Sequence, residues 1–172
     1  MEIRHIQEND DRLSVSNIYE EGWKFAYRGI VPQDYLDSIP PGRWVPYLDQ
    51  DGVHSLMMTE DGKLIGTSSY SRSRTAQFHD FGEIISIYLL PEYMGRGYGR
   101  LLLEAAVKEL EKLGYEDIFL WVLAENRNAR KFYERCGFTP TQHYMDHEIG
   151  GKKLQEIQYC RFSGKDGHSK EK

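Results

Sequence analysis

Two short, largely apolar segments joined by a glycine-rich turn and an amphipathic helix constrain this fold more than any other feature. Residues 82–90 and 118–123 carry isoleucine, leucine and other apolar residues at successive positions, which is typical of strands buried on both faces. Between them, Leu102, Ala106 and Leu110 recur at helical spacing. Two such strands joined by a helix lie parallel, with a right-handed crossover. The sequence therefore predicts a β-α-β unit inside a sheet.

The rest of the chain adds hairpins and N-terminal helices. Asp61-Gly62 and Gly150-Gly151 are turn signals between extended segments. Further strands are predicted at about residues 2–7, 54–59, 63–71, 139–148 and 153–162, and further helices at about 11–27, 33–38, 44–48 and 126–136. We therefore expect an α/β (α+β) fold, with a mixed, mostly antiparallel central sheet around a parallel β-α-β core flanked by helices.

Length and composition exclude several classes of protein. The 172 residues fit one domain over residues 1–162, followed by a polar tail, residues 163–172, that we predict to be disordered. Lys and Arg number 22 and Asp and Glu 27, so the net charge is −5, which argues against a nucleic-acid partner. No apolar stretch has the length of a signal peptide or a membrane span. Two cysteines are too few for a disulfide framework. We expect a soluble cytoplasmic protein without a membrane partner, and the sequence leaves a homodimer open.

The turn after the first buried strand has the character of an anion-binding site. Glycines let the backbone turn tightly and approach a ligand, and the first amides of the following helix have no helical acceptor. Such amides suit a phosphate or pyrophosphate, and two arginines add positive charge. The turn reads Met94-Gly95-Arg96-Gly97-Tyr98-Gly99-Arg100.

Three interpretations of this turn compete. The first is an ordinary turn that binds no ligand. The second is a nucleotide-binding loop, and the third is a loop that binds the pyrophosphate of coenzyme A. A dinucleotide motif G-x-G-x-x-G does not fit the spacing of Gly95, Gly97 and Gly99. A P-loop does not fit either, because no Lys-Ser or Lys-Thr follows the last glycine.

Two segments resemble the GCN5-related N-acetyltransferases (GNAT). Residues 87–99 are similar to the acyl-CoA signature of that family, and residues 126–138 are similar to a second family segment at the expected distance. The order of predicted elements also matches, and the resemblance covers nearly the whole chain except the tail. It implies the GNAT-like acyl-CoA acyltransferase fold and acetyl-CoA as cofactor. Met94 departs from the Gln or Arg usual in the family. We expect binding to survive, because the amides that follow, not this side chain, take the pyrophosphate.

The resemblance also implies how the cofactor is held. The central strand of the family splays from its parallel neighbour at a bulge, so that pantetheine pairs like an extra strand with main chain near Tyr88 and Leu89. Amides from about Gly95 to Arg100 take the pyrophosphate. Asn126 matches an asparagine that contacts the amide arm of the cofactor, and its alternative role is simply to cap a helix.

Tyr133 and Glu83 are the implied catalytic residues. Tyr133 matches a tyrosine near the thioester sulfur, where a phenol can protonate the leaving thiolate; the alternative is a half-buried aromatic of the helix core. Glu83 stands where many relatives carry a base, and it acts either through ordered water or by attracting a cationic acceptor. Some relatives that modify protein N-termini carry a Glu near the position of Trp121. This chain has no Glu there, which argues against membership of that subclass.

Other reactive side chains have structural explanations. Cys136 falls on the predicted buried face of a helix, where cysteine behaves as a small apolar residue. His143 and His147 lie four apart, but in a predicted strand that spacing does not form a helical metal site. We therefore expect neither an acyl-cysteine nor a metal.

The leading hypothesis is direct acetyl transfer from acetyl-CoA to a primary amine of a small molecule, such as a polyamine, amino acid or aminoglycoside. Trp23 and Tyr27, four residues apart on an N-terminal helix, are the candidate acceptor-binding residues, and the alternative for each is an ordinary core aromatic of that helix. One alternative is a protein N-terminal or lysine acetyltransferase. The other is an acyl-CoA-binding sensor that transfers nothing.

Overall fold

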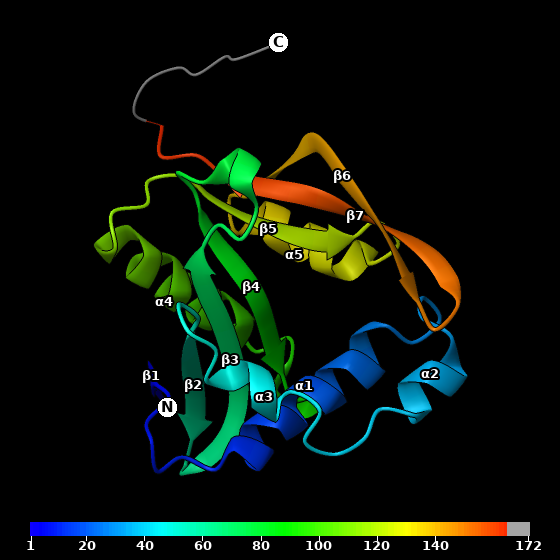
Figure 1. Cartoon of the computed structure of the whole chain (residues 1–172). Helices are drawn as coiled ribbons and strands as arrows, with labels where there is room; N and C mark the ends of the chain where they lie inside the picture. Colours follow the sequence, from blue (N-terminus) through cyan, green and yellow to red (C-terminus); the bar gives the residue numbers. More distant parts are fainter. Residues whose placement is uncertain (165–172) are drawn as a thin grey trace.

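Seven strands form one sheet, and five α-helices lie on its two faces (Figure 1). The computed structural model describes residues 1–164, so the predicted disorder of the tail lies outside the described residues from Lys165 onward. The strands are β1 (Glu2–His5), β2 (His54–Glu60), β3 (Lys63–Arg72), β4 (Gly82–Leu89), β5 (Ile118–Leu123), β6 (Thr139–Ile149) and β7 (Lys152–Arg161). The helices are α1 (Arg12–Ala26), α2 (Gln33–Asp37), α3 (Val45–Leu48), α4 (Tyr98–Lys112) and α5 (Arg127–Arg135).

The strand order is β1-β2-β3-β4-β5-β7-β6. Only the β4–β5 pair is parallel, and α4 connects its two strands. Every other neighbouring pair is antiparallel. This arrangement confirms the mixed, mostly antiparallel sheet around a parallel β-α-β core.

The predicted elements are all present, with small shifts at their ends. β1 stops at His5 rather than at residue 7, because the amide of Gln7 donates to the Asp10 carboxylate and leaves the sheet. Two 3₁₀ helices, η1 (Ala76–Phe78) and η2 (Pro91–Tyr93), were not predicted. No helix within residues 1–164 is both long enough and apolar enough to span a membrane.

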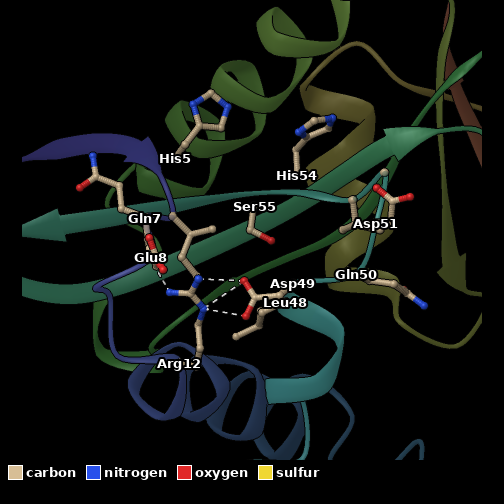
Figure 2. Close-up of a pocket in the computed structure, with 13 residues that line it drawn as sticks. His5, Gln7, Glu8, Arg12, Leu48, Asp49, Gln50, Asp51, His54 and Ser55 are labelled. Atoms are coloured by element: carbon tan, nitrogen blue, oxygen red, sulfur yellow. Dashed lines mark hydrogen bonds and ion pairs between the residues drawn. The ribbon is translucent and has the colours of Figure 1, made fainter.

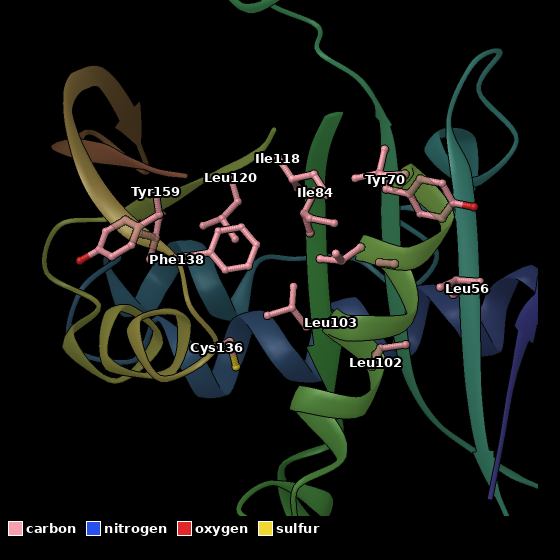
Figure 3. Close-up of a cluster of buried hydrophobic side chains, with 14 of the residues drawn as sticks. Leu56, Tyr70, Ile84, Leu102, Leu103, Ile118, Leu120, Cys136, Phe138 and Tyr159 are labelled. Atoms are coloured by element: carbon pink, nitrogen blue, oxygen red, sulfur yellow. The ribbon is translucent and has the colours of Figure 1, made fainter. Parts of the chain in front are cut away.

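The main core lies between the sheet and α4 with α5 (Figure 3). Helix α4 contributes five fully buried residues, and the strands supply apolar side chains from the same face. Phe138, which follows α5, is completely buried in this core. The core members from α4 are Leu102, Leu103, Ala106, Val107 and Leu110.

The parallel pair separates halfway along its length. β4 pairs with β5 only from Gly82 to Ile84. At the next position the register with β3 shifts by one, because Ser69 pairs with Ser86 whereas Tyr70 pairs with Ile84. Ile85 is therefore the extra residue of a β-bulge. Beyond it β4 and β5 diverge, which confirms the expected splay.

The opposite face of the sheet carries α1, α2 and α3, and the β6–β7 hairpin reaches down to α2 (Figure 1). At the hairpin tip, a Cβ on Gly150 would lie 2.7 Å from Cβ of Tyr35, so only glycine allows this approach. Lys152 Nζ donates to the Ile30 carbonyl at 2.8 Å. The hairpin thus closes one side of the space between the splayed strands and the N-terminal helices.

Replacing Phe138 by alanine tests whether this core holds the fold. We expect the free energy of unfolding to fall by about 3–5 kcal/mol, because the truncation leaves a cavity. The matched control is Phe162→Ala, whose side chain is 57% exposed, with an expected change below about 0.5 kcal/mol. Urea unfolding followed by circular dichroism measures both, and equal losses would contradict the assignment.

Candidate active site

The glycine turn presents unpaired amides at the carboxyl end of β4. Gly95 and Gly97 have φ angles of +75° and +86°, in the left-handed region that favours glycine. The first helical bond of α4 runs from the Leu101 amide to the Gly97 carbonyl. The amides of the preceding three residues therefore have no helical acceptor and point out of the helix start. This geometry suits a pyrophosphate.

Charge and packing around the turn agree with that role. Arg96 and Arg100 are exposed, and the Arg96 guanidinium lies 5.2 Å from the ring centroid of Tyr93. Met94 packs its side chain against the main core. The methionine therefore contributes packing, and the departure from Gln or Arg leaves the amides of the turn unobstructed.

The splay leaves one edge of β4 without a partner strand. Tyr88 and Leu89 pair with Thr67 and Gly66 of β3 on one side. On the other side, the pairing with β5 has already ended. Their free backbone groups are available to an extended ligand, which is the arrangement of β-augmentation.

Asn126 caps α5. Its Oδ1 accepts from the Ala129 amide at 3.2 Å, and the residue is 9% exposed. The capping role is therefore present in the structure. The Nδ2 group makes no hydrogen bond within residues 1–164, so a cofactor contact through this donor stays a prediction.

Three phenols from different elements gather where the strands part. Tyr27, at the end of α1, shares a hydrogen bond of 3.2 Å with Tyr88 of β4. Tyr133 of α5 interacts electrostatically with both. Burial raises the pKa of all three phenols above the usual value of 10. Gly22 permits this approach, because a Cβ there would lie 2.5 Å from the Tyr88 ring. The structure thus brings Tyr27, Tyr88 and Tyr133 together from the two faces of the sheet.

A cavity of about 310 Å³ lies beside these phenols, between β3–β4 and the N-terminal helices. Trp23 lines it and packs edge-on against Tyr27, with ring centroids 4.8 Å apart. Tyr27 is not a lining residue, and it meets the site through Tyr88. The cavity residues are Tyr19, Trp23, Tyr35, Ile39, Arg43, Trp44, Tyr47, Leu48, Gln50, Val53, Ser69, Arg74, Ile85, Ser86 and Tyr88.

Glu83 is buried, with 2% exposure, and is fully engaged by Arg74. The Arg74 guanidinium reaches its Oε1 at 2.7 Å, and the Arg74 amide donates to its Oε2 at 2.9 Å. Both carboxylate oxygens are therefore occupied. Sequence reasoning missed Arg74, since it lies in the irregular segment after β3 and only the folded chain sets it against Glu83.

Glu156 of β7 is a second carboxylate that sequence reasoning missed. It pairs in register with Leu123 of β5, beyond the point where β4 separates. His147 Nε2 lies 2.9 Å from its carboxylate. Burial raises the pKa of Glu156, and Arg74 and Glu83 lie close enough to affect it.

A signal for Glu156 was available in the alternation of β7. Inward positions of a strand should be apolar, yet the positions that alternate with Leu154 are Glu156 and Gln158. Gln158 is 1% exposed, and its Nε2 has no hydrogen-bond partner among residues 1–164. Buried polar groups on this face mark a site rather than a core.

A larger hollow, of about 850 Å³, adjoins the smaller cavity at Leu48, Gln50 and Val53 (Figure 2). It surrounds the start of β2 at His54 and the ion pair of Arg12 with Asp49, which are 2.8 Å apart. β2 and β4 both run antiparallel to β3, so this hollow lies at the end of the sheet opposite to the glycine turn. No predicted cofactor or catalytic residue lines it, and we assign the chemistry to the smaller cavity.

The thiols are buried, and the histidines of β6 form no metal site within the described part of the chain. Burial raises the pKa of the Cys136 thiol, and it raises that of Cys160 to about 12. Both thiols are therefore neutral and unreactive at neutral pH. His143 and His147 lie on β6, as predicted. Within residues 1–164, no group of three or more His, Cys, Asp or Glu side chains is placed to hold a metal ion.

A splayed parallel strand pair that ends in a glycine turn with unpaired amides is the arrangement expected of an acyl-CoA acyltransferase fold. The sequence profile of the acetyltransferase (GNAT) family matches residues 14–138, and the chain belongs to this family. Members use acetyl-CoA as the acyl donor, so the protein is an N-acetyltransferase of the GNAT type.

Individual relatives agree with this assignment. The uncharacterized N-acetyltransferase YuaI of Bacillus subtilis is 28% identical over 151 residues, 86% of each chain. A spermidine N(1)-acetyltransferase of Thermoplasma acidophilum is 24% identical over 80% of this chain and 88% of its own. The fold matches the structure of PaiA N-acetyltransferase from T. acidophilum in complex with coenzyme A, with a TM-score of 0.71, 21% identity and coverage of 94% and 99% of the two chains.

The partly buried carboxylate of Glu156 should cost stability at neutral pH. A folded-state pKa above the usual 4.5 means that folding favours the protonated form, so stability is lost as the pH rises through the folded-state pKa. The amide of Glu156→Gln carries no such penalty. We expect the variant to gain stability relative to wild type between pH 4.5 and pH 7.5. Urea unfolding at both pH values measures this gain, with the exposed Glu148→Gln as control. A constant difference between variant and wild type would contradict the assignment.

Proposed function

We propose that this protein transfers an acetyl group from acetyl-CoA to a primary amine of a small molecule. The observation that carries the proposal is that two features lie together where β4 separates from β5. Unpaired amides lie at one end of the gap, and three partly buried phenols with a cavity beside them lie at the other. A cavity of about 310 Å³ is at the lower end of the size range for small-molecule sites, which favours a small amine over a peptide.

The cofactor residues have defined tasks in this proposal. The amides from Gly95 to Arg100 bind the pyrophosphate, and Arg96 and Arg100 add charge. The open backbone edge at Tyr88 and Leu89 pairs with pantetheine. Asn126 offers its free Nδ2 to the same arm while its oxygen caps α5. The thioester then lies near the Ile85 bulge, facing the cavity.

Tyr133 acts on the leaving group. Its raised pKa keeps the phenol protonated at neutral pH, so its hydroxyl can donate a hydrogen bond to the thiolate as the carbon–sulfur bond breaks. Tyr88 and Tyr27, which share a hydrogen bond, support its position. The amine nitrogen attacks the carbonyl carbon directly, and no acyl-enzyme forms.

The two carboxylates divide their roles. Both oxygens of Glu83 already accept hydrogen bonds from Arg74, which supports a positioning role: Glu83 fixes Arg74 at the cavity wall. Glu156 is the better proton acceptor for the amine, because a raised pKa makes a carboxylate more basic. His147 is 44% exposed and can pass that proton to water.

Two alternative functions, a protein acetyltransferase and an acyl-CoA sensor, have less support than a small-molecule acetyltransferase. The glutamate that the resemblance implies for some relatives that modify protein N-termini is absent here, because Trp121, a half-buried aromatic packed on Phe119, stands near that position. An acyl-CoA sensor without transfer predicts cofactor binding but no release of free thiol with any amine. A homodimer in the cytoplasm stays a prediction.

Gly97→Val tests the cofactor site. The substitution strains a left-handed residue and places a branched side chain over the amides, so we expect the Kd for acetyl-CoA to rise at least about tenfold, or about 1.4 kcal/mol. Gly114→Val is the control for strain alone, because Gly114 has φ +94° at the other end of α4. Isothermal titration calorimetry measures the Kd of both variants for acetyl-CoA. Equal affinity in the two variants would contradict the assignment of the glycine turn as the cofactor site.

Tyr133→Phe tests the role of the phenol. Loss of the hydroxyl should lower kcat by about 10²-fold, the scale of general acid catalysis, with the Kd for acetyl-CoA within about twofold of wild type. Free thiol released with an amine panel gives kcat, and calorimetry gives the Kd. The control is Tyr144→Phe, an exposed phenol on β6. Unchanged turnover in the Tyr133 variant would remove this residue from the chemistry.

A further inference from the structure

The charges that line the acceptor cavity are all positive. Among residues 1–164, Arg43 and Arg74 are its only charged lining residues, and no Asp or Glu of that range forms part of its wall. The nearby acid Glu83 is only 2% exposed and is paired with Arg74, and Glu156, the proposed proton acceptor, is not a lining residue. A molecule in the cavity therefore meets two guanidinium groups in the wall itself, and the carboxylate that accepts the proton of its amine lies outside that wall.

Both arginines have hydrogen-bonding capacity to spare. Arg43, in the turn between α2 and α3, is exposed and has no ion-pair partner within residues 1–164. Arg74 uses Nε and Nη2 for Glu83, which leaves Nη1 free. A guanidinium with free N–H groups is the side chain best suited to bind a carboxylate or phosphate.

The remainder of the wall is largely aromatic. Six rings surround the space, and the Trp23 and Trp44 rings lie 5.5 Å apart. Such a wall accommodates an apolar body. The rings belong to Tyr19, Trp23, Tyr35, Trp44, Tyr47 and Tyr88.

We propose that the acceptor is an amino-acid-like amine: a small molecule with one amino group, an apolar or aromatic body and a carboxylate or similar anion that Arg43 and Arg74 bind. This inference rests on the proposed function and selects among its substrates. A polyamine or aminoglycoside would bring a second ammonium against two guanidinium groups, which is unfavourable. The net charge of −5 affects how a ligand approaches the protein from solution, whereas the two arginines of the cavity act on a ligand that is already in contact with them.

The experiment compares each amine with and without its anion. Purified wild-type protein with acetyl-CoA is given a panel of amino acids, the corresponding amides and decarboxylated amines, and spermidine, and release of free thiol is followed. We expect at least one amino acid to exceed its decarboxylated partner at least about tenfold in kcat/KM, about 1.4 kcal/mol. Arg43→Gln should reduce that ratio at least about tenfold. Arg28→Gln, an exposed arginine of the same region outside the cavity wall, should leave it unchanged.

Three results would count against the inference, and they are distinguishable. Preference for spermidine or for decarboxylated amines overturns the inference and leaves the proposed function standing. A ratio that Arg43→Gln leaves unchanged removes the arginine from recognition. Binding of acetyl-CoA without thiol release from any amine overturns the proposed function, and the inference with it.

Discussion

The separation of β4 from β5 is the constraint on which the rest of this structure depends. One extra residue, Ile85, shifts the register of β4 against β3 and ends its pairing with β5 at Ile84. A strand with open backbone groups inside a sheet is unfavourable unless something pairs with it. The bulge therefore creates a place for an extended ligand where a continuous sheet would have been more stable. It also opens a passage through the sheet, so that Tyr133 on one face and Tyr27 on the other reach the same point.

Around that gap, the protein keeps polar groups where a core would be apolar. Glu83 is buried against Arg74, Glu156 is partly buried beside His147, and Gln158 holds an unpartnered amide. Buried polar and charged groups lower stability unless they are fully paired. The apolar core between the sheet and α4 offsets this cost, and it lies on the other face, where Leu103 and Phe138 are fully buried. One face of the sheet therefore stabilises the fold, while the other face holds the candidate site.

Recognition of the two substrates follows different physics. In the proposed function the cofactor is held by main-chain amides and a backbone edge, which depend on glycine and on strand geometry rather than on the side chain of Met94. The proposed acceptor contacts come from side chains of α1, the α2–α3 turn and the segment after β3. Side chains on such irregular segments vary without disturbing the sheet, and a family with one cofactor can therefore serve many amines.

The sequence by itself determined the order of elements, the parallel pair, the glycine turn and the candidates Tyr133, Asn126 and Glu83, because these depend on local periodicity, turn chemistry and motif spacing. It could not show that Glu83 is engaged by Arg74, that Tyr27 meets Tyr88, that Arg43 lines the cavity, or that Glu156 lies beside His147. Each of these relations joins residues from separate elements. Only the bulge at Ile85, the close approach at Gly22 and the hairpin contact at Tyr35 bring those elements within reach. Contacts between residues that are far apart in the sequence depend on tertiary packing, and local sequence patterns do not specify them.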